Sequence, residues 1–186
     1  MTRPALVPLA VLAVLTLAPA AGRALAQGYG PGDVYANIPP IDDRGRRQIP
    51  MFYAWNPDPL GNHERQLASV QPELAAVVRR ALAENPGLRF VVGSGTRSWQ
   101  QQRQAEEWGW SPRTHPFAAS PSLRKHLEGR AVDLWPLDEN QRITFAPAAQ
   151  GRIATAMLRA ARELRVPISW GGGWRRKKDP THFELR

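Results

Sequence analysis

Cysteine is absent from this sequence, and its absence excludes both a disulfide-stapled scaffold and a lipid anchor attached through a cysteine. The sequence also shows no internal repeat and no recognisable nucleic-acid-binding motif beyond positive charge. The chain is nevertheless 186 residues long with 42% hydrophobic content, which is sufficient for one sizeable core. We therefore expect a single folded domain that relies on this core for its stability.

Acidic residues are few, because 16 Asp and Glu stand against 25 Lys and Arg and give a net charge of +9. A protein this basic could bind nucleic acid, anionic lipid or an anionic cell-wall polymer. The charge could also serve solubility alone. Composition leaves these alternatives open.

The first 26 residues have the pattern of a secretory signal peptide. Arg3 gives a positive start, residues 5–21 form an uncharged apolar run, and Ala24-Leu25-Ala26 fits the small-x-small cleavage pattern. An uncleaved anchor is the alternative, but Pro8 and Pro19 interrupt a run that is already short for a membrane span. We expect an exported protein of the periplasm or cell envelope, without stable membrane insertion and without nucleic acid as a partner.

Proline and glycine are concentrated between residues 27 and 61, where the apolar residues follow neither a helical nor an alternating period. We interpret residues 27–61 as an extended arm or linker. Its apolar cluster at residues 51–55 is expected to pack on the domain, with a ligand-gripping role as the alternative. Residues 62–186 then form the folded domain.

Within that domain, apolar periodicity and punctuating residues predict three helices and four short strands. The helices begin near Pro72, Ser98 and Pro147, and Ser98 with Gln101 offers a capping box. The strands are expected at residues 88–92, 129–135, 168–170 and 181–185. Because helices and strands mix without a regular strand–helix–strand repeat, the sequence predicts an α+β fold.

Two histidines and an aspartate are candidate metal ligands. His126 precedes Asp133 by seven residues and His182 lies near the C-terminus, each histidine beside a carboxylate in what we interpret as a strand-edge context. Three such ligands with an open fourth position are the usual arrangement around a catalytic zinc ion. Asp133 lies within a predicted strand, and a buried carboxylate needs a cation nearby. That cation is either a metal or an arginine such as Arg97 or Arg130.

The remaining polar candidates depend on their distance from these ligands. Asp179, three residues before His182, could act as a general base, and so could Glu184, which shares a strand face with His182. Spacing alone does not separate the two carboxylates. Arg97 follows a glycine-rich turn, where it could bind a substrate carboxylate, stabilise an oxyanion or simply be solvated. His63 and His115 have no partner spacing and are not expected to be ligands.

These residues together resemble the zinc peptidases that cut peptidoglycan stem peptides. That family includes L-alanyl-D-glutamate endopeptidases and VanY-like D-alanyl-D-alanine carboxypeptidases, and the resemblance covers roughly residues 67–185. The matching motifs are Gly95-Thr96-Arg97-Ser98 with Gln102, His126-Leu127-Glu128-Gly129-Arg130-Ala131-Val132-Asp133, Glu163-Leu164-Arg165-Val166-Pro167-Ile168, Trp170-Gly171-Gly172 and Asp179-Pro180-Thr181-His182-Phe183-Glu184-Leu185.

The resemblance implies the compact α+β fold shared by DD-peptidases and hedgehog-like domains, with the site on a small antiparallel sheet. It implies one Zn²⁺ ion held by His126, Asp133 and His182. The implied activity is hydrolysis of peptide bonds in peptidoglycan stem peptides, foremost as an L-alanyl-D-glutamate endopeptidase. A D-alanyl-D-alanine carboxypeptidase on the same polymer and a non-catalytic cell-wall-binding module are the alternatives.

The resemblance also assigns roles around the metal. It favours Asp179 over Glu184 as the general base. Arg97 would face the substrate or its oxyanion as a catalytic and substrate-binding residue, and Gln102 would help to form the same substrate-binding corner.

The sequence departs from the family pattern in the loop before His126, which is longer than in compact relatives, and at three further places. Arg124 stands where a serine often lies two residues before the first ligand. Gly173 stands where an aspartate usually follows tryptophan-glycine-glycine, and Arg175-Arg176-Lys177-Lys178 makes the approach to Asp179 unusually basic. None of these departures removes a predicted ligand or the predicted base.

Overall fold

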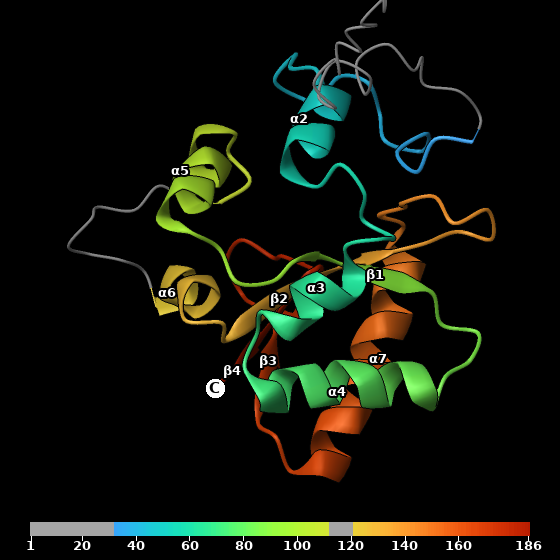
Figure 1. The fold of residues 1–186 in the computed structure, drawn as a ribbon, viewed down its shortest axis with the longest axis vertical. Helices are drawn as coiled ribbons and strands as arrows, with labels where there is room; N and C mark the ends of the chain where they lie inside the picture. Colours follow the sequence, from blue (N-terminus) through green and yellow to red (C-terminus); the bar gives the residue numbers. More distant parts are fainter. Residues whose placement is uncertain (1–31, 112–120) are drawn as a thin grey trace, which may run out of the picture.

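The computed structural model describes residues 32–111 and 121–186. The signal peptide predicted over residues 1–26 lies outside these residues and stays a prediction. The described elements, in chain order, are α2 (Gln48–Trp55), α3 (His63–Ala68), α4 (Pro72–Ala83), β1 (Phe90–Ser94), α5 (Trp99–Glu107), α6 (Pro121–Leu127), β2 (Ala131–Pro136), α7 (Pro147–Leu164), β3 (Ile168–Trp170), the 3₁₀ turn η1 (Gly171–Gly173) and β4 (His182–Leu185) (Figure 1).

A four-stranded sheet in the order β1-β2-β4-β3 forms the centre of the fold, and every neighbouring pair is antiparallel. Two pairings decide where the polar residues meet. Asp133 on β2 lies opposite His182 on the neighbouring strand β4. On the other side of β2, it lies opposite Ser94 on β1. With helices around this small antiparallel sheet, the predicted α+β fold is confirmed.

The two faces of the sheet carry different apolar clusters, because successive strand residues point to opposite sides. Val132 and Leu134 belong to the larger cluster, which packs against α4 and α7 (Figure 1). Trp135 and Val91 point the other way and pack on the segment that precedes the predicted domain. Asp133 shares the Trp135 face, so it stands on the side of the sheet away from α4 and α7.

Local sequence signals account for the starts of α4, α5 and α7. Pro72 and Pro147 occupy the first turns of α4 and α7, where the missing N–H of proline costs no hydrogen bond. The capping box of Ser98 and Gln101 forms at the start of α5, as predicted. β1 begins at Phe90, two residues later than expected. No helix among the described residues is both long and apolar enough to cross a membrane.

The prediction of an extended arm is wrong for residues 48–55, which form α2. Ile49 and Phe52 of α2 are buried together with Tyr35 and Ile38 from the preceding turn. The Tyr35 hydroxyl donates a hydrogen bond of 2.5 Å to the Asn56 carbonyl, which closes this segment on itself. Tertiary burial stabilises α2, a helix whose apolar residues do not form a single stripe.

Candidate active site

The three predicted metal ligands meet at one point of the sheet. The Nε2 atom of His126 lies 3.3 Å from Nδ1 of His182 and 3.3 Å from Oδ1 of Asp133. The third side of the triangle, from His182 Nδ1 to Asp133 Oδ1, measures 3.2 Å. All three residues are buried. The β2–β4 register places Asp133 and His182 side by side.

His126 reaches this point from a helix, which differs from the strand-edge context predicted for it. It occupies the penultimate position of α6, whose bounds are Pro121–Leu127. The next residues turn through Gly129, whose φ of +67° suits glycine. A three-dimensional contact between α6 and β2, rather than a shared strand, therefore completes the triad.

The triangle fits a zinc ion with tetrahedral coordination. Zinc–ligand bonds of about 2.0–2.1 Å at tetrahedral angles place neighbouring ligand atoms about 3.3–3.4 Å apart. The observed separations of 3.2–3.3 Å agree with that spacing. Two nitrogens and one carboxylate oxygen also leave a fourth position for water or substrate, as in catalytic zinc sites.

Each ligand is oriented by a second partner on its remaining polar atom. Nδ1 of His126 donates to the Gly95 carbonyl at 2.9 Å. Because a carbonyl only accepts, the proton of this imidazole is on Nδ1, and Nε2 is left with a lone pair for a metal. Nε2 of His182 donates to Glu184 at 3.0 Å, which directs Nδ1 into the triad. Such partners fix ligand orientation in metal sites.

The electrostatics keep the Asp133 carboxylate charged and the His126 ring neutral. Burial alone would raise the pKa of Asp133, but the charge of Arg97 and the hydrogen bond from His182 hold it well below its usual range. Burial, assisted by the nearby Arg97 charge, lowers the pKa of His126. Burial also lowers the pKa of His182, but its bonds to the Asp133 and Glu184 carboxylates outweigh this and raise it to about 9.

Arg97 bonds directly to the aspartate of the triad. Its Nη2 donates to Oδ2 of Asp133 in a short ion pair, while Nε donates to Ser94 Oγ at 2.9 Å. The guanidinium also lies over the ring of Trp55, 5.2 Å from its centroid, an arrangement that favours a cation. The Asp133 carboxylate can therefore bind both of the cations considered for it, the arginine at Oδ2 and a metal at Oδ1.

Gln102 is a hydrogen-bond partner of Arg97. Its Oε1 accepts a bond of 3.3 Å from Nη1 of Arg97, and its Nε2 donates to Ser111 at 3.0 Å. Only 1% of Gln102 is exposed. The structure thus places Gln102 where it positions Arg97, and its predicted part in the substrate-binding corner stays a prediction.

Asp179 lies at the edge of the triad in the loop that leads into β4. Its Oδ1 accepts hydrogen bonds from the hydroxyl and the backbone N–H of Thr181, at 2.7 and 3.2 Å. Its backbone N–H donates to the Gly171 carbonyl at 3.1 Å, and its own carbonyl accepts from the His182 N–H at 3.2 Å. These four bonds fix the carboxylate of Asp179 close to His182.

Glycine at position 171 is required for this arrangement. A Cβ atom there would lie 2.5 Å from the Asp179 carbonyl oxygen and 3.2 Å from the Cβ of His182. Gly173, two residues later, would meet nothing closer than Trp170 at 4.0 Å. Gly173, which replaces the aspartate of the family pattern, is at the exposed end of η1 and does not contact the predicted metal ligands.

Arg124 is also remote from the ligands. It is exposed on α6 and pairs with Glu128 one turn later at 3.1 Å. His126 has its own partner in the Gly95 carbonyl, 2.9 Å from its Nδ1 atom. The departure from the family pattern at Arg124 leaves the triad intact.

The triad opens into a cleft of about 1010 Å³ that we call the active-site cleft. Arg97, Asp179 and the three predicted ligands line it, and α5 and the loop before β4 form parts of its walls. One wall is aromatic and consists of Phe52, Trp55, Trp110, Trp135 and Phe145. The apolar cluster at residues 51–55 was expected to pack on the domain, with a ligand-gripping role as the alternative. Phe52 packs on the sheet, and Phe52 and Trp55 also line the cleft. Trp110, Trp135 and Phe145 were not predicted to belong to the site.

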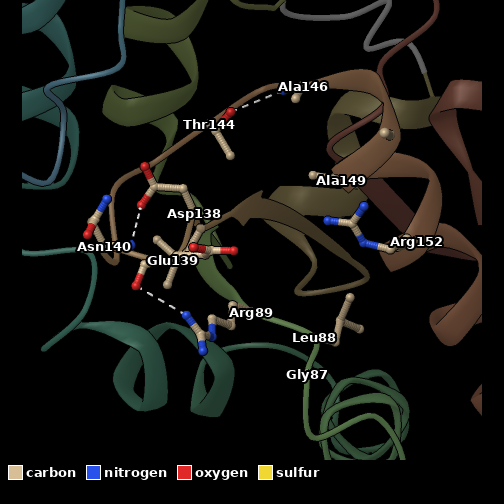
Figure 2. A pocket seen from close by; sticks show the side chains of 12 residues that line it. Gly87, Leu88, Arg89, Asp138, Glu139, Asn140, Thr144, Ala146, Ala149 and Arg152 are labelled. Atoms are coloured by element: carbon tan, nitrogen blue, oxygen red, sulfur yellow. Dashed lines mark hydrogen bonds between the residues drawn. The ribbon is translucent and has the colours of Figure 1, made fainter.

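A second pocket of about 630 Å³ is separate from the triad. It lies between the α4–β1 connection, the β2–α7 connection and the start of α7. Figure 2 shows its polar lining, in which Arg89 donates to the Glu139 carbonyl at 3.2 Å. Arg152 and Asp138 also line this pocket, but none of the triad residues does.

The fold and the site define an α+β protein in which two histidines and one aspartate, all buried, could hold a metal ion, with the Asp179 carboxylate nearby. Residues 60–184 match the family described as phage L-alanyl-D-glutamate peptidase. The chain belongs to this family, and the family predicted from its motifs, with the predicted hydrolase class, is confirmed.

Two relatives, one from a phage and one with a solved structure, agree with this assignment. The L-alanyl-D-glutamate peptidase of Escherichia phage T5 is 33% identical over 125 residues, covering 67% of this chain and 86% of the phage protein. The crystal structure of the L-Ala D-Glu endopeptidase ChiX from Serratia marcescens aligns with a TM-score of 0.57 and 34% identity, covering 67% of this chain and 86% of ChiX. The vancomycin-resistance D,D-dipeptidase VanXYg aligns with a TM-score of only 0.40 and 19% identity, over 62% of this chain and 50% of that chain.

Proposed function

We propose that this protein is a zinc-dependent L-alanyl-D-glutamate endopeptidase that cuts peptidoglycan stem peptides. The carrying observation is the triangle of His126, Asp133 and His182 donor atoms, whose 3.2–3.3 Å sides suit tetrahedral zinc. The family match and the two relatives named for this bond support the choice of substrate.

The reaction divides between the metal and the protein. Zinc, when bound by the triad, would polarise the scissile carbonyl and make water a stronger nucleophile near neutral pH. Asp179, held by Thr181, accepts the proton of the attacking water and returns it to the leaving amine. Arg97 keeps Asp133 ionised and oriented and presents its guanidinium at the cleft for the oxyanion or a substrate carboxylate.

The family and the relatives named for the L-alanyl-D-glutamate bond favour an endopeptidase over a carboxypeptidase. The active-site cleft of about 1010 Å³ has room for several residues of a stem peptide, which either enzyme would bind.

Export to the periplasm or cell envelope remains part of the proposal. It is supported by the apolar run and the cleavage pattern within the first 26 residues. An exported enzyme would meet peptidoglycan directly.

Digestion of purified muropeptides with the metal-loaded protein, followed by mass spectrometry, tests the proposed bond. We expect cleavage between L-alanine and D-glutamate, loss of activity with a chelator and recovery with Zn²⁺. Release of free D-alanine would identify a carboxypeptidase instead. A protein that binds muropeptides, holds zinc and releases no product would be a wall-binding module.

A further inference from the structure

A group of cations lines the active-site cleft beside the proposed base. Arg176, Lys177 and Lys178 precede Asp179 directly and line the cleft, and all three are exposed. Arg44, from the segment before α2, lines the same cleft. Across residues 32–111 and 121–186, no ion pair joins any of these four to a carboxylate.

Other surface cations of this protein do find acidic partners. Arg80 pairs with Glu84 at 2.5 Å and with Glu163 at 3.1 Å. Arg159 pairs with Glu163 at 3.0 Å. Unpaired cations also occur elsewhere on the described surface, but these four line the active-site cleft, where a ligand can supply the negative charge.

Of the acidic residues in the cleft, Asp179 follows the three cations directly, and the others lie on other elements. Glu106 and Glu107 are at the end of α5, and Glu106 accepts a bond of 3.4 Å from Gln102. Asp133 is neutralised by Arg97. The three consecutive cations beside Asp179 thus give this end of the cleft a local excess of positive charge.

We infer that Arg176, Lys177 and Lys178 form a subsite for a free carboxylate of the substrate, with Arg44 adding to the same field. This inference rests on the proposed function. A glutamyl residue has two carboxyl groups besides its amine, and at most one of them continues the peptide chain. The other is a carboxylate or, where it has been converted to an amide, a neutral group of nearly the same shape. The subsite selects stem peptides in which this group is charged.

A pair of substrates tests the inference. Two synthetic stem peptides with the same L-alanyl-D-glutamyl bond are compared, one with the free carboxylate and one with the carboxamide. We expect kcat/KM to be about fivefold higher for the carboxylate at low salt, the size of effect that exposed ion pairs give. The preference should decline as salt is raised, because the cations are exposed.

Two variants assign the preference to these side chains. The double variant Lys177→Gln/Lys178→Gln is expected to abolish most of the preference by raising KM for the carboxylate peptide, with kcat unchanged. Arg175→Gln is the matched control, since Arg175 is an exposed residue of the same basic run that is not among the residues lining the cleft. This control is expected to keep the wild-type preference.

The outcomes separate this inference from the proposed function. Cleavage of neither peptide by the zinc-loaded wild type refutes the endopeptidase itself. Equal cleavage of both peptides refutes only the carboxylate subsite. A double variant that slows both peptides equally also overturns it, because the cations would then attract the substrate without reading this group. Circular dichroism and zinc content show whether each variant has folded.

Discussion

Arg97 and Asp133 form an ion pair on the carboxylate oxygen that points away from the two histidines, with side chains that are only 11% and 10% exposed. The other oxygen, Oδ1, completes the donor triangle. Arg97 therefore acts on the metal site through its ligand as well as facing the cleft. An arginine that contacted only substrate would have no such connection to the metal.

Replacement of Arg97 by alanine is expected to weaken zinc binding as well as catalysis. Loss of a partner that orients a metal ligand typically costs about 10–100-fold in metal affinity. Zinc affinity is measured by competition with a chromophoric chelator. Arg130→Ala is the matched control, because Arg130 donates to the Arg186 carbonyl at 2.8 Å and not to Asp133. An unchanged zinc affinity in Arg97→Ala would show that Arg97 serves only the substrate.

Removal of the charge of Asp179 is expected to lower kcat, whereas removal of the charge of Glu184 is expected to weaken zinc binding. Asp179→Asn should keep zinc and lower kcat by about 10²–10⁴-fold, the usual contribution of a general base. Glu184→Gln should weaken zinc binding by about tenfold, because Glu184 orients His182 at 3.0 Å, and should recover activity at saturating zinc. Parallel measurements of zinc content and kcat distinguish the two. Full activity in Asp179→Asn would exclude it as the base.

Zinc binding is expected to release a proton from His182. Burial opposes its charge, but the Asp133 and Glu184 carboxylates raise its pKa to about 9 in the metal-free protein. A metal binds the neutral imidazole, so below pH 9 the proton must leave first. Apparent zinc affinity should therefore rise about tenfold per pH unit from pH 7 and flatten above about pH 9. Calorimetry in buffers of different ionisation enthalpy counts the released protons, and a count of zero at pH 7 would contradict the raised pKa.

Much of the site could be predicted because its residues lie in short, recognisable motifs. An aspartate inside an apolar strand requires a cation, which pointed to Asp133. The strands that carry Asp133 and His182 were both predicted, and they pair with these two residues opposite each other. The sequence could not show that His126 reaches them from α6, because this depends on the packing of distant segments. Glu184 was predicted to share a strand face with His182, and the structure shows that the two side chains bond. The sequence also left the cation beside Asp133 open between metal and arginine, and the geometry accommodates both.

The N-terminal segment was harder to predict for a physical reason. The apolar residues of α2 do not follow a single stripe, and the helix is stabilised by contacts with Trp135 and Trp110, which are more than 50 residues away in the chain. Local periodicity carries no information about such contacts. The prediction of an extended arm followed from composition and missed the aromatic wall of the cleft.

Gly171 and Gly173 provide a matched pair within η1. Gly171→Ala introduces a Cβ 2.5 Å from the Asp179 carbonyl oxygen, so the base must move, and a shift of about 1 Å can cost about 100-fold in rate. Gly173→Ala meets nothing closer than 4.0 Å and should retain most activity. Comparison of kcat at saturating zinc checks both. Equal activities would mean that the η1 backbone moves without disturbing Asp179.

Phe52 tests whether the N-terminal segment belongs to the cooperative fold. Its ring lies 4.9 Å from that of Trp110 and 5.5 Å from that of Trp135, and 7% of the residue is exposed. Phe52→Ala is therefore expected to lower the free energy of unfolding by about 3–5 kcal/mol, as for other buried phenylalanines. Leu60→Ala, at a position that is 40% exposed, is the control and should change it by about 0.5 kcal/mol or less. Urea unfolding measures both, and a loss below about 1 kcal/mol for Phe52→Ala would mean that α2 packs on the sheet too loosely to form a fixed wall of the cleft.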